Sequence, residues 1–226
     1  MKAVQVIKVD ENLTPQELAK QLKKPEGDTG KIVGDGMNKS NLHINTNAFD
    51  LLDLNENDSI LEVGFGNGKL IPELFKRAKN ITYCGLDLSA TMVEEATTFN
   101  SDLVKDGTVE LLEGSINQLC YGTNTFDKIV TVNTLYFWDK PEEVMQELKR
   151  VLKPNGKLVI GIRDKDLVKE MPFTKFGFTL YKGTEAVELA KSADFKSVEL
   201  INKDEPEIEV NGEVYFLTGS FLVIEK

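Results

Sequence analysis

The segment ILEVGFGNGKL, residues 60–70, carries three glycines at alternate positions directly after a short apolar run. Glycine has no Cβ, so the backbone on either side of it can approach a ligand closely. A strand that runs into such a loop and then into a helix is a typical place for a nucleotide-like ligand. The spacing of Gly64, Gly66 and Gly68 therefore predicts a ligand-binding loop, and the surrounding residues must indicate which ligand.

Two well-known glycine patterns do not fit this loop. A phosphate-binding Walker loop requires GxxxxGK followed by Ser or Thr, but here Leu70 follows Lys69 and Val63 occupies the position of the first glycine. A dinucleotide fingerprint requires GxGxxG, and the third glycine, Gly68, comes one residue early. The first pattern is excluded, whereas the second is a near miss that keeps a nicotinamide-dependent oxidoreductase as an alternative.

A carboxylate about twenty residues beyond the loop supports a nucleoside ligand. Asp87 ends the apolar run in YCGLDLS, residues 83–89. A carboxylate at the end of a second strand can accept hydrogen bonds from both hydroxyls of a ribose. Alternatively, Asp87 caps the helix that is expected to begin near Ser89.

The elements that must position these residues alternate along the chain. Helical patterns separate most of the apolar runs, and the clearest helix is EEVMQELKRVL, residues 142–152. Such alternation predicts a doubly wound α/β fold, with a mostly parallel sheet covered on both faces. Strands are expected at residues 59–63, 81–86, 108–112, 126–132, 157–162 and 196–201.

The C-terminal region breaks this alternation. FKSVELI, residues 195–201, is followed by IEVNGEVYF, residues 208–216, in which Asn211-Gly212 favours a tight hairpin turn. An antiparallel strand is therefore expected at the edge of the sheet. The pattern leaves open whether EVYFL or FLVIE supplies it.

The N-terminal region is expected to be a separate extension. Thr14-Pro15-Gln16-Glu17 forms a capping-box pattern at the start of a short helix. An irregular stretch is expected over residues 31–46. We therefore divide the chain into a helix and lid-like segment over residues 1–45 and a main domain over residues 46–226.

Composition limits the classes of function. The chain has 226 residues and a formal net charge of −10, which argues against a nucleic-acid binder or a polybasic membrane-binding surface. Neither a signal-peptide core nor an apolar run near the ~18 residues of a membrane span is evident. Cys84 and Cys120 lack metal-ligand and CxxC spacing, so a cytoplasmic protein with two free thiols and no metal is expected.

Five ordered motifs resemble those of the class I S-adenosylmethionine-dependent methyltransferases. They are ILEVGFGNGKL, GLDLSATMVEEA, VELLEGSINQL, FDKIVTVNTLYFW and RVLKPNGKLVIG. The resemblance covers residues 40–165 and is strongest to the small-molecule branch that includes the enzymes of ubiquinone and menaquinone biosynthesis. It implies a seven-stranded Rossmann-like sheet, S-adenosylmethionine as the cofactor and an enzyme that transfers its methyl group.

The resemblance also implies how this chain would hold the cofactor. Asn133 would offer its backbone carbonyl to the cofactor's amino group. Ser115 stands where an aspartate is common, which puts the hydrogen bond to the adenine amino group in question. The methionine part would lie against Glu62, Gly64, Gly66 and Gly68, the ribose on Asp87, and the adenine against Leu88, Ser115 and Ile116.

Two residues are candidates for catalysis. His43 is the only histidine and is a possible general base near neutral pH. Tyr136 and Lys140 form the YxxxK pattern of short-chain oxidoreductases, but Lys140 precedes Pro141, and a residue before proline is biased away from helix. Transfer from a sulfonium mainly requires alignment of donor and acceptor, so a base is needed only when the acceptor must lose a proton.

The aromatic residues and missing motifs indicate a small-molecule acceptor. NTLY, residues 133–136, is not the Asn-Pro-Pro-Tyr motif of amino-directed nucleic-acid and protein methylases, and no Pro-Cys pair suggests a cytosine-C5 enzyme. O-, N- and C-methylation stay open, as do a monomer or a homodimer and a non-catalytic cofactor-binding protein. Candidates for the walls of an apolar pocket are Tyr136, Phe137, Trp138, Phe173, Phe176, Phe178 and Tyr181.

Overall fold

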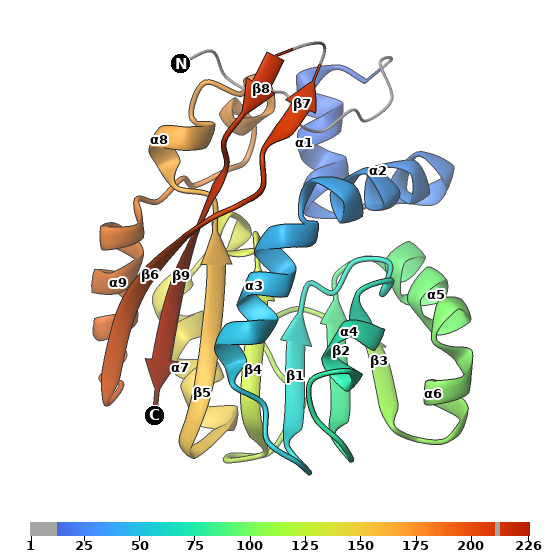
Figure 1. Ribbon diagram of the computed structural model, residues 1–226, viewed down its shortest axis with the longest axis vertical. Helices are drawn as coiled ribbons and strands as arrows, with labels where there is room; N and C mark the ends of the chain where they lie inside the picture. The colour runs from blue at the N-terminus through green and yellow to red at the C-terminus, as the bar shows by residue number, and fades with distance from the viewer. Residues whose placement is uncertain (1–12, 211–212) are drawn as a thin grey trace.

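The computed structural model describes residues 13–210 and 213–226. Its centre is a seven-stranded sheet of strand order β3-β2-β1-β4-β5-β9-β6, in which only β9 runs antiparallel to its neighbours (Figure 1). The doubly wound fold expected from the sequence is therefore confirmed. The strands are β1 (Ser59–Val63), β2 (Thr82–Asp87), β3 (Val109–Glu113), β4 (Phe126–Val132), β5 (Leu152–Ile162), β6 (Ser197–Asp204) and β9 (Thr218–Glu225).

The C-terminal strands settle the alternative that the sequence left open. FLVIE lies within β9, which inserts between β5 and β6. The competing segment forms β8 (Glu213–Tyr215), which pairs only with β7 (Ile208–Val210) in a separate two-stranded sheet. Antiparallel pairing of β7 with β8 agrees with the expected hairpin, although its turn, Asn211-Gly212, lies outside the described residues.

Helices cover both faces of the sheet, because successive residues of its strands place apolar side chains on opposite faces. Ile60 of β1 packs into a buried cluster with α3 and α4, whereas its neighbour Leu61 packs into the cluster on the opposite face with α7. Successive side chains of a strand point to opposite faces, so a strand buried on both sides is apolar throughout. The covering helices are α3 (Leu42–Leu52), α4 (Ile71–Phe75), α5 (Ala90–Phe99), α6 (Ser101–Lys105), α7 (Pro141–Val151) and α9 (Gly183–Lys191).

The N-terminal segment is more helical than its composition predicts. The capping box at Thr14 is confirmed at the start of α1 (Pro15–Lys23). The irregular structure expected over residues 31–46 is wrong, because α2 (Gly27–Ser40) and the first turns of α3 occupy this stretch. Glycine and asparagine are poor helix formers, but burial of Val33 and Gly34 between neighbouring helices supplies the stabilisation that propensity lacks.

The expected division of the chain at residue 45 falls inside α3, which packs on β4, β5 and β9. Figure 1 shows α2 lying across the carboxyl ends of β1 and β2, so the N-terminal helices adjoin the edge of the sheet where ligands bind in open α/β folds. Within the described ranges, none of the helices has the length and apolar character needed to cross a membrane.

Candidate functional site

A cavity of about 300 Å³ lies at the carboxyl ends of β1, β2 and β4. Its walls come from the glycine loop, the end of β2, residues 114–117, residues 132–134 and helix α2. These segments are distant in sequence but meet because parallel strands end at the same edge of the sheet. The cavity is therefore the place where the residues singled out by the sequence can be compared.

The three glycines of the loop have positive φ angles of 81°, 62° and 71°, which other residues rarely adopt. Gly64 and Gly66 line the cavity. A Cβ at Gly66 would meet nothing within 4 Å, whereas one at Gly68 would lie 2.5 Å from the Cβ of Ala96 in α5. Gly68 packs against α5 and is not among the residues that line the cavity, and its contact with the cofactor stays a prediction.

Asp87 lines the cavity, whereas the N-cap of α5 is Ser89, whose hydroxyl accepts a hydrogen bond from the backbone N–H of Met92. One carboxylate oxygen accepts a hydrogen bond from the backbone N–H of Gly66, and the other accepts one from that of Ser89, each at 2.9 Å. Burial raises the pKa of Asp87 to about 6, although these two hydrogen bonds favour the ionised form. Asp87 thus fixes the glycine loop and the start of α5 while it lines the cavity.

Glu62 is a second buried carboxylate in the same cavity. It accepts a hydrogen bond of 2.8 Å from the Tyr83 hydroxyl. Burial, with a smaller contribution from Asp87, raises the pKa of Glu62 to about 7 against the opposing effect of Tyr83. Lys23 also lines the cavity, but within the described part of the chain neither carboxylate forms an ion pair with a lysine, arginine or histidine.

The remaining cofactor candidates also lie around this cavity. Leu88, Ser115, Ile116 and Asn133 all line it. The Ser115 hydroxyl accepts a hydrogen bond from the backbone N–H of Asn117 at 3.2 Å, while Leu88 and Ile116 offer apolar surface. Asn133 has a φ of 57°, a left-handed conformation that asparagine tolerates better than most residues.

Helix α2 contributes residues that the sequence analysis missed. Asn67, buried within the glycine loop, donates to Asp35 of α2 at 2.8 Å and accepts from Asn38 at 2.5 Å. These bonds hold α2 over the loop. The sequence does contain a pattern for this helical face, because the cavity is lined at nearly helical spacing by Gly34, Asn38, Asn41 and Asn45. Apolar periodicity does not reveal this pattern, since its residues are small and polar.

The structure does not bring either catalytic candidate to the cavity in a form suited to proton transfer. His43 lies two positions from both Asn41 and Asn45, which line the first cavity. Two positions correspond to about 200° of rotation around a helix, so His43 is on the other side, and it lines neither cavity of this region. Tyr136 is buried, which raises its pKa well above the ordinary value. Its hydroxyl is hydrogen-bonded to the backbone of Arg163.

The YxxxK pair is separated as well. Tyr136 belongs to the short 3-10 helix η1 (Leu135–Phe137), while Lys140 is exposed and bonds to Glu143 at 2.8 Å. The two side chains share no helical face, so the geometry that an oxidoreductase of this type needs is not formed.

The aromatic candidates divide between two cavities and the surface. Phe137 and Trp138 line the first cavity, and the Nε1 of Trp138 is buried without a hydrogen-bond partner among the described residues. Phe173 and Phe178 line a second, smaller cavity. Phe176 is exposed, and neither it nor Tyr181 contributes to either cavity.

The residues of the first cavity suit S-adenosylmethionine chemically. The cofactor carries a sulfonium and an ammonium group beside its own carboxylate, and its ribose has two hydroxyls. Glu62 and Asp87 line the cavity without a cationic partner among the described residues, so a positive group and the ribose hydroxyls are suitable partners for them. The space beside Gly66 and the unpartnered Trp138 Nε1 leave room and a donor for a polar ligand. In the same described part of the chain, no group of three or more His, Cys, Asp and Glu side chains is arranged to hold a metal ion.

Comparison with known proteins gives the same class. Residues 61–160 match the family described as methyltransferase domain. The chain is 30% identical over 180 residues to the uncharacterized methyltransferase YdaC of Bacillus subtilis, covering 79% of this chain and 94% of that one. It is also 30% identical over 147 residues to the malonyl-[acyl-carrier protein] O-methyltransferase of Halalkalibacterium halodurans, covering 61% and 53% of the two chains.

Solved structures share the fold. The crystal structure of a SAM-dependent methyltransferase from Aquifex aeolicus superposes with a TM-score of 0.62 at 23% identity, covering 94% of this chain and 99% of that one. The family match and the relative from Bacillus subtilis, together with the fold, identify the class I S-adenosylmethionine-dependent methyltransferases. The chain belongs to this family, and it is an enzyme whose cofactor is S-adenosylmethionine.

Proposed function

We propose that this enzyme methylates a small molecule and that S-adenosylmethionine lies in the 300 Å³ cavity. The observation that carries the proposal is the pair of buried carboxylates, Glu62 and Asp87, which face the cavity without a cationic partner among the described residues. Burying a carboxylate is unfavourable unless a hydrogen-bonding or charged partner compensates for the lost hydration. The hydrogen bonds from Tyr83, Gly66 and Ser89 compensate only in part, because the pKa of each carboxyl group is still raised. A bound cofactor would add a positive charge near Glu62 and hydroxyl donors to Asp87.

Each carboxylate has capacity for a ligand. A carboxylate oxygen can accept more than one hydrogen bond, so Asp87 can hold the ribose hydroxyls while it keeps the N–H groups of Gly66 and Ser89. Glu62 uses one bond to Tyr83 and would stabilise the positive end of the methionine part. Gly64 and Gly66 would lie beside that part.

The rest of the cavity would position the adenine and the amino group. Leu88 and Ile116 would pack on the adenine, with Ser115 beside it, and the backbone carbonyl of Asn133 would accept from the cofactor's amino group. Bound S-adenosylmethionine supplies a methyl group on a positively charged sulfur, which is a good leaving group. Alignment of that methyl with an acceptor, away from water, can account for about 7–11 kcal/mol of the barrier.

The small-molecule acceptor is supported by charge and by enclosure. A formal net charge of −10 disfavours nucleic acid as the substrate, and the first cavity adjoins a second one, lined largely by apolar side chains. The same charge and the absence of a spanning helix in the described ranges agree with a cytoplasmic location.

Calorimetric titration tests the cofactor site. S-adenosylmethionine, S-adenosylhomocysteine and NADH are titrated into the wild type, Asp87→Ala and, as a matched control, Asp102→Ala at an exposed position of α6. We expect the two sulfur nucleosides to bind the wild type and the control. Affinity should fall at least 30-fold in Asp87→Ala, which corresponds to loss of about 2 kcal/mol of charge-assisted hydrogen bonding. Binding that is indifferent to Asp87, or a preference for NADH, would contradict the proposed site.

A further inference from the structure

The second cavity, of about 100 Å³, lies against the first. We call it the apolar chamber. The two cavities have five lining residues in common: Leu22, Met37, Asn41, Asn133 and Phe137. A molecule in the apolar chamber would therefore lie next to a cofactor in the first cavity, on the side of Asn133 and Phe137.

The apolar chamber offers neither a charged partner nor a base. Within the described part of the chain, no Asp, Glu, His, Lys or Cys lines it. Burial raises the pKa of Tyr136 well above its ordinary value, and its hydroxyl is already bonded to the Arg163 backbone, so it stays neutral. Most of the wall is aliphatic or aromatic, including Met37, Leu167, Val168, Met171, Phe173 and Phe178.

Arg163 is the one cation that lines the apolar chamber in the described residues, and its charge is already neutralised. Both terminal nitrogens of its guanidinium donate to the carboxylate of Glu205, with Nη2 and Oε2 2.9 Å apart. The two side chains are 10% and 2% exposed. A bidentate, buried pair of this kind leaves no free positive charge for an anionic substrate.

Hydrogen-bonding capacity is concentrated where the two cavities meet. The hydroxyls of Ser40 and Thr174 donate to the nearby backbone carbonyls of Met37 and Met171. The side-chain amide of Asn41, by contrast, has no hydrogen-bond partner in the described ranges, and that of Asn133 only accepts from Tyr136, at 3.2 Å. These two amides can therefore bind one polar atom of a substrate at the junction.

Size restricts the substrate as well. A cavity of about 150 Å³ in another protein holds one benzene molecule. The apolar chamber, at about 100 Å³, is smaller than that, so it limits the substrate to no more than one ring, whose polar atom would extend toward the junction with the first cavity.

We propose that the acceptor is a small, uncharged arylamine-type molecule, an inference that rests on the proposed function. Its ring would lie in the apolar chamber and its nitrogen between Asn41 and Asn133. A neutral arylamine has a lone pair available without a base. An alkylamine is protonated near neutral pH, and burying that cation beside a sulfonium is unfavourable. A phenol would need a base, and none of the described residues in the wall of the apolar chamber can act as one.

The step balances without a further reagent. The nitrogen lone pair forms the new N–C bond while the S–C bond breaks and leaves its electrons on sulfur, which becomes a neutral thioether. The methylated nitrogen is then cationic and releases one proton to water. Asn41 and Asn133 orient the amine and remain unchanged.

The test measures binding and turnover on the same protein. Aniline, phenol, benzylamine and benzoate are compared as acceptors by release of S-adenosylhomocysteine, and as ligands by saturation-transfer NMR with S-adenosylhomocysteine bound. We expect aniline to bind and be methylated in preference to the other three. A preference for phenol, benzylamine or benzoate would overturn the proposal. So would the absence of both binding and turnover for aniline in protein that binds S-adenosylmethionine.

Variants of Val168 locate the ligand. Val168→Phe, which fills the chamber, should weaken aniline binding about tenfold or more, while Val168→Ala, which enlarges the chamber, should admit an aniline that carries one methyl group on its ring. Phe176→Ala, at an exposed position outside the chamber, is the control. Aniline binding that is equal in all three variants would overturn the placement. Failure to bind S-adenosylmethionine in the wild type would instead contradict the proposed function.

Discussion

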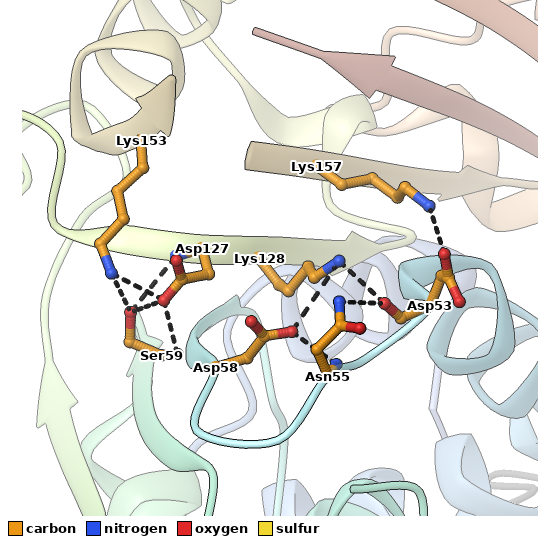
Figure 2. Close-up of polar contacts among 8 residues, drawn as sticks. All are labelled: Asp53, Asn55, Asp58, Ser59, Asp127, Lys128, Lys153 and Lys157. Carbon is orange, nitrogen blue, oxygen red and sulfur yellow. Dashed lines mark hydrogen bonds and ion pairs between the residues drawn. The ribbon is translucent and has the colours of Figure 1, made fainter. Parts of the chain in front are cut away.

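Acidic side chains lie at both ends of the parallel strands of the central sheet, but their partners differ. We call the side where these strands end the carboxyl edge and the side where they begin the amino edge. At the carboxyl edge, Glu62 and Asp87 face a cavity, and no ion pair is formed with them in the described ranges. At the amino edge, Asp127 accepts hydrogen bonds from Lys153 at 2.7 Å and from Ser59 at 2.7 and 2.9 Å (Figure 2). Carboxylates at both edges accept hydrogen bonds from the protein, but in the described ranges only those at the amino edge also form ion pairs with lysines.

The amino edge repeats this compensation along the sheet. Figure 2 shows Lys128 beside Asp58, 3.8 Å away, and Lys157 beside Asp53, 3.4 Å away. Lys128 also donates to the backbone carbonyl of Asp53 at 2.8 Å. A carboxylate paired with a lysine of the same protein needs no ligand, so this edge has a structural role.

The pKa of Asp127 at the amino edge shifts in the opposite direction to the pKa values of Glu62 and Asp87 at the carboxyl edge. Burial raises the pKa of Asp127, but hydrogen bonds from Lys153 and Ser59 outweigh that effect and lower it overall. Burial raises the pKa of Glu62 to about 7 and that of Asp87 to about 6. A carboxyl group that is costly to ionise in the free protein is one that a cationic ligand can stabilise.

The largest effect expected from this comparison is on the pH dependence of stability. Because the pKa of Glu62 is raised from 4.5 to about 7 on folding, the native state binds more protons between these values. The free energy of unfolding should therefore fall as pH rises through this window, by up to about 3 kcal/mol for Glu62 alone. Denaturant titrations from pH 5 to 8 measure this change.

The control for that experiment is Glu62→Gln, which removes the charge but keeps the size of the side chain. Its free energy of unfolding should fall less between pH 5 and 8 than that of the wild type. Equal slopes for the two proteins would mean that Glu62 is ionised in the free protein at no cost, and the contrast between the edges would disappear.

A smaller effect is expected at the amino edge. Asp127→Asn keeps the shape but removes the charge that pairs with Lys153, so the free energy of unfolding at pH 7 should fall by about 1 kcal/mol. Affinity for S-adenosylmethionine should not change, because the site lies at the opposite edge. Parallel thermal and calorimetric measurements on this variant check both statements, and a clear loss of affinity would contradict the division of roles.

The residues of the carboxyl edge could be predicted from the sequence because their signals are local. A strand, a glycine loop and a carboxylate at the end of the next strand lie within residues 59–89, and the alternation of elements fixes the edge at which they meet. The packing of Gly68 on Ala96 could not be predicted in this way, because Ala96 lies in a helix further along the chain.

Helix α2 and the apolar chamber could not be predicted in the same way. α2 has a composition that disfavours helix and is stabilised by contacts with α1, α3 and α5. The apolar chamber combines residues from α1, α2, η1 and residues 163–180 with Leu217. No local pattern in the sequence indicates which of these aromatic and aliphatic side chains surround a cavity and which, like Phe176, lie at the surface.

We propose that a bound cationic cofactor compensates the buried acidic side chains at the carboxyl edge. The most direct test is proton exchange on binding, measured by titrating S-adenosylmethionine calorimetrically at pH 6.5 in buffers of different ionisation enthalpy. Since Glu62 has a pKa of about 7 in the free protein, the wild type should release protons on binding, and Glu62→Gln should release fewer. Binding without proton release, or equal release from the two proteins, would contradict the account.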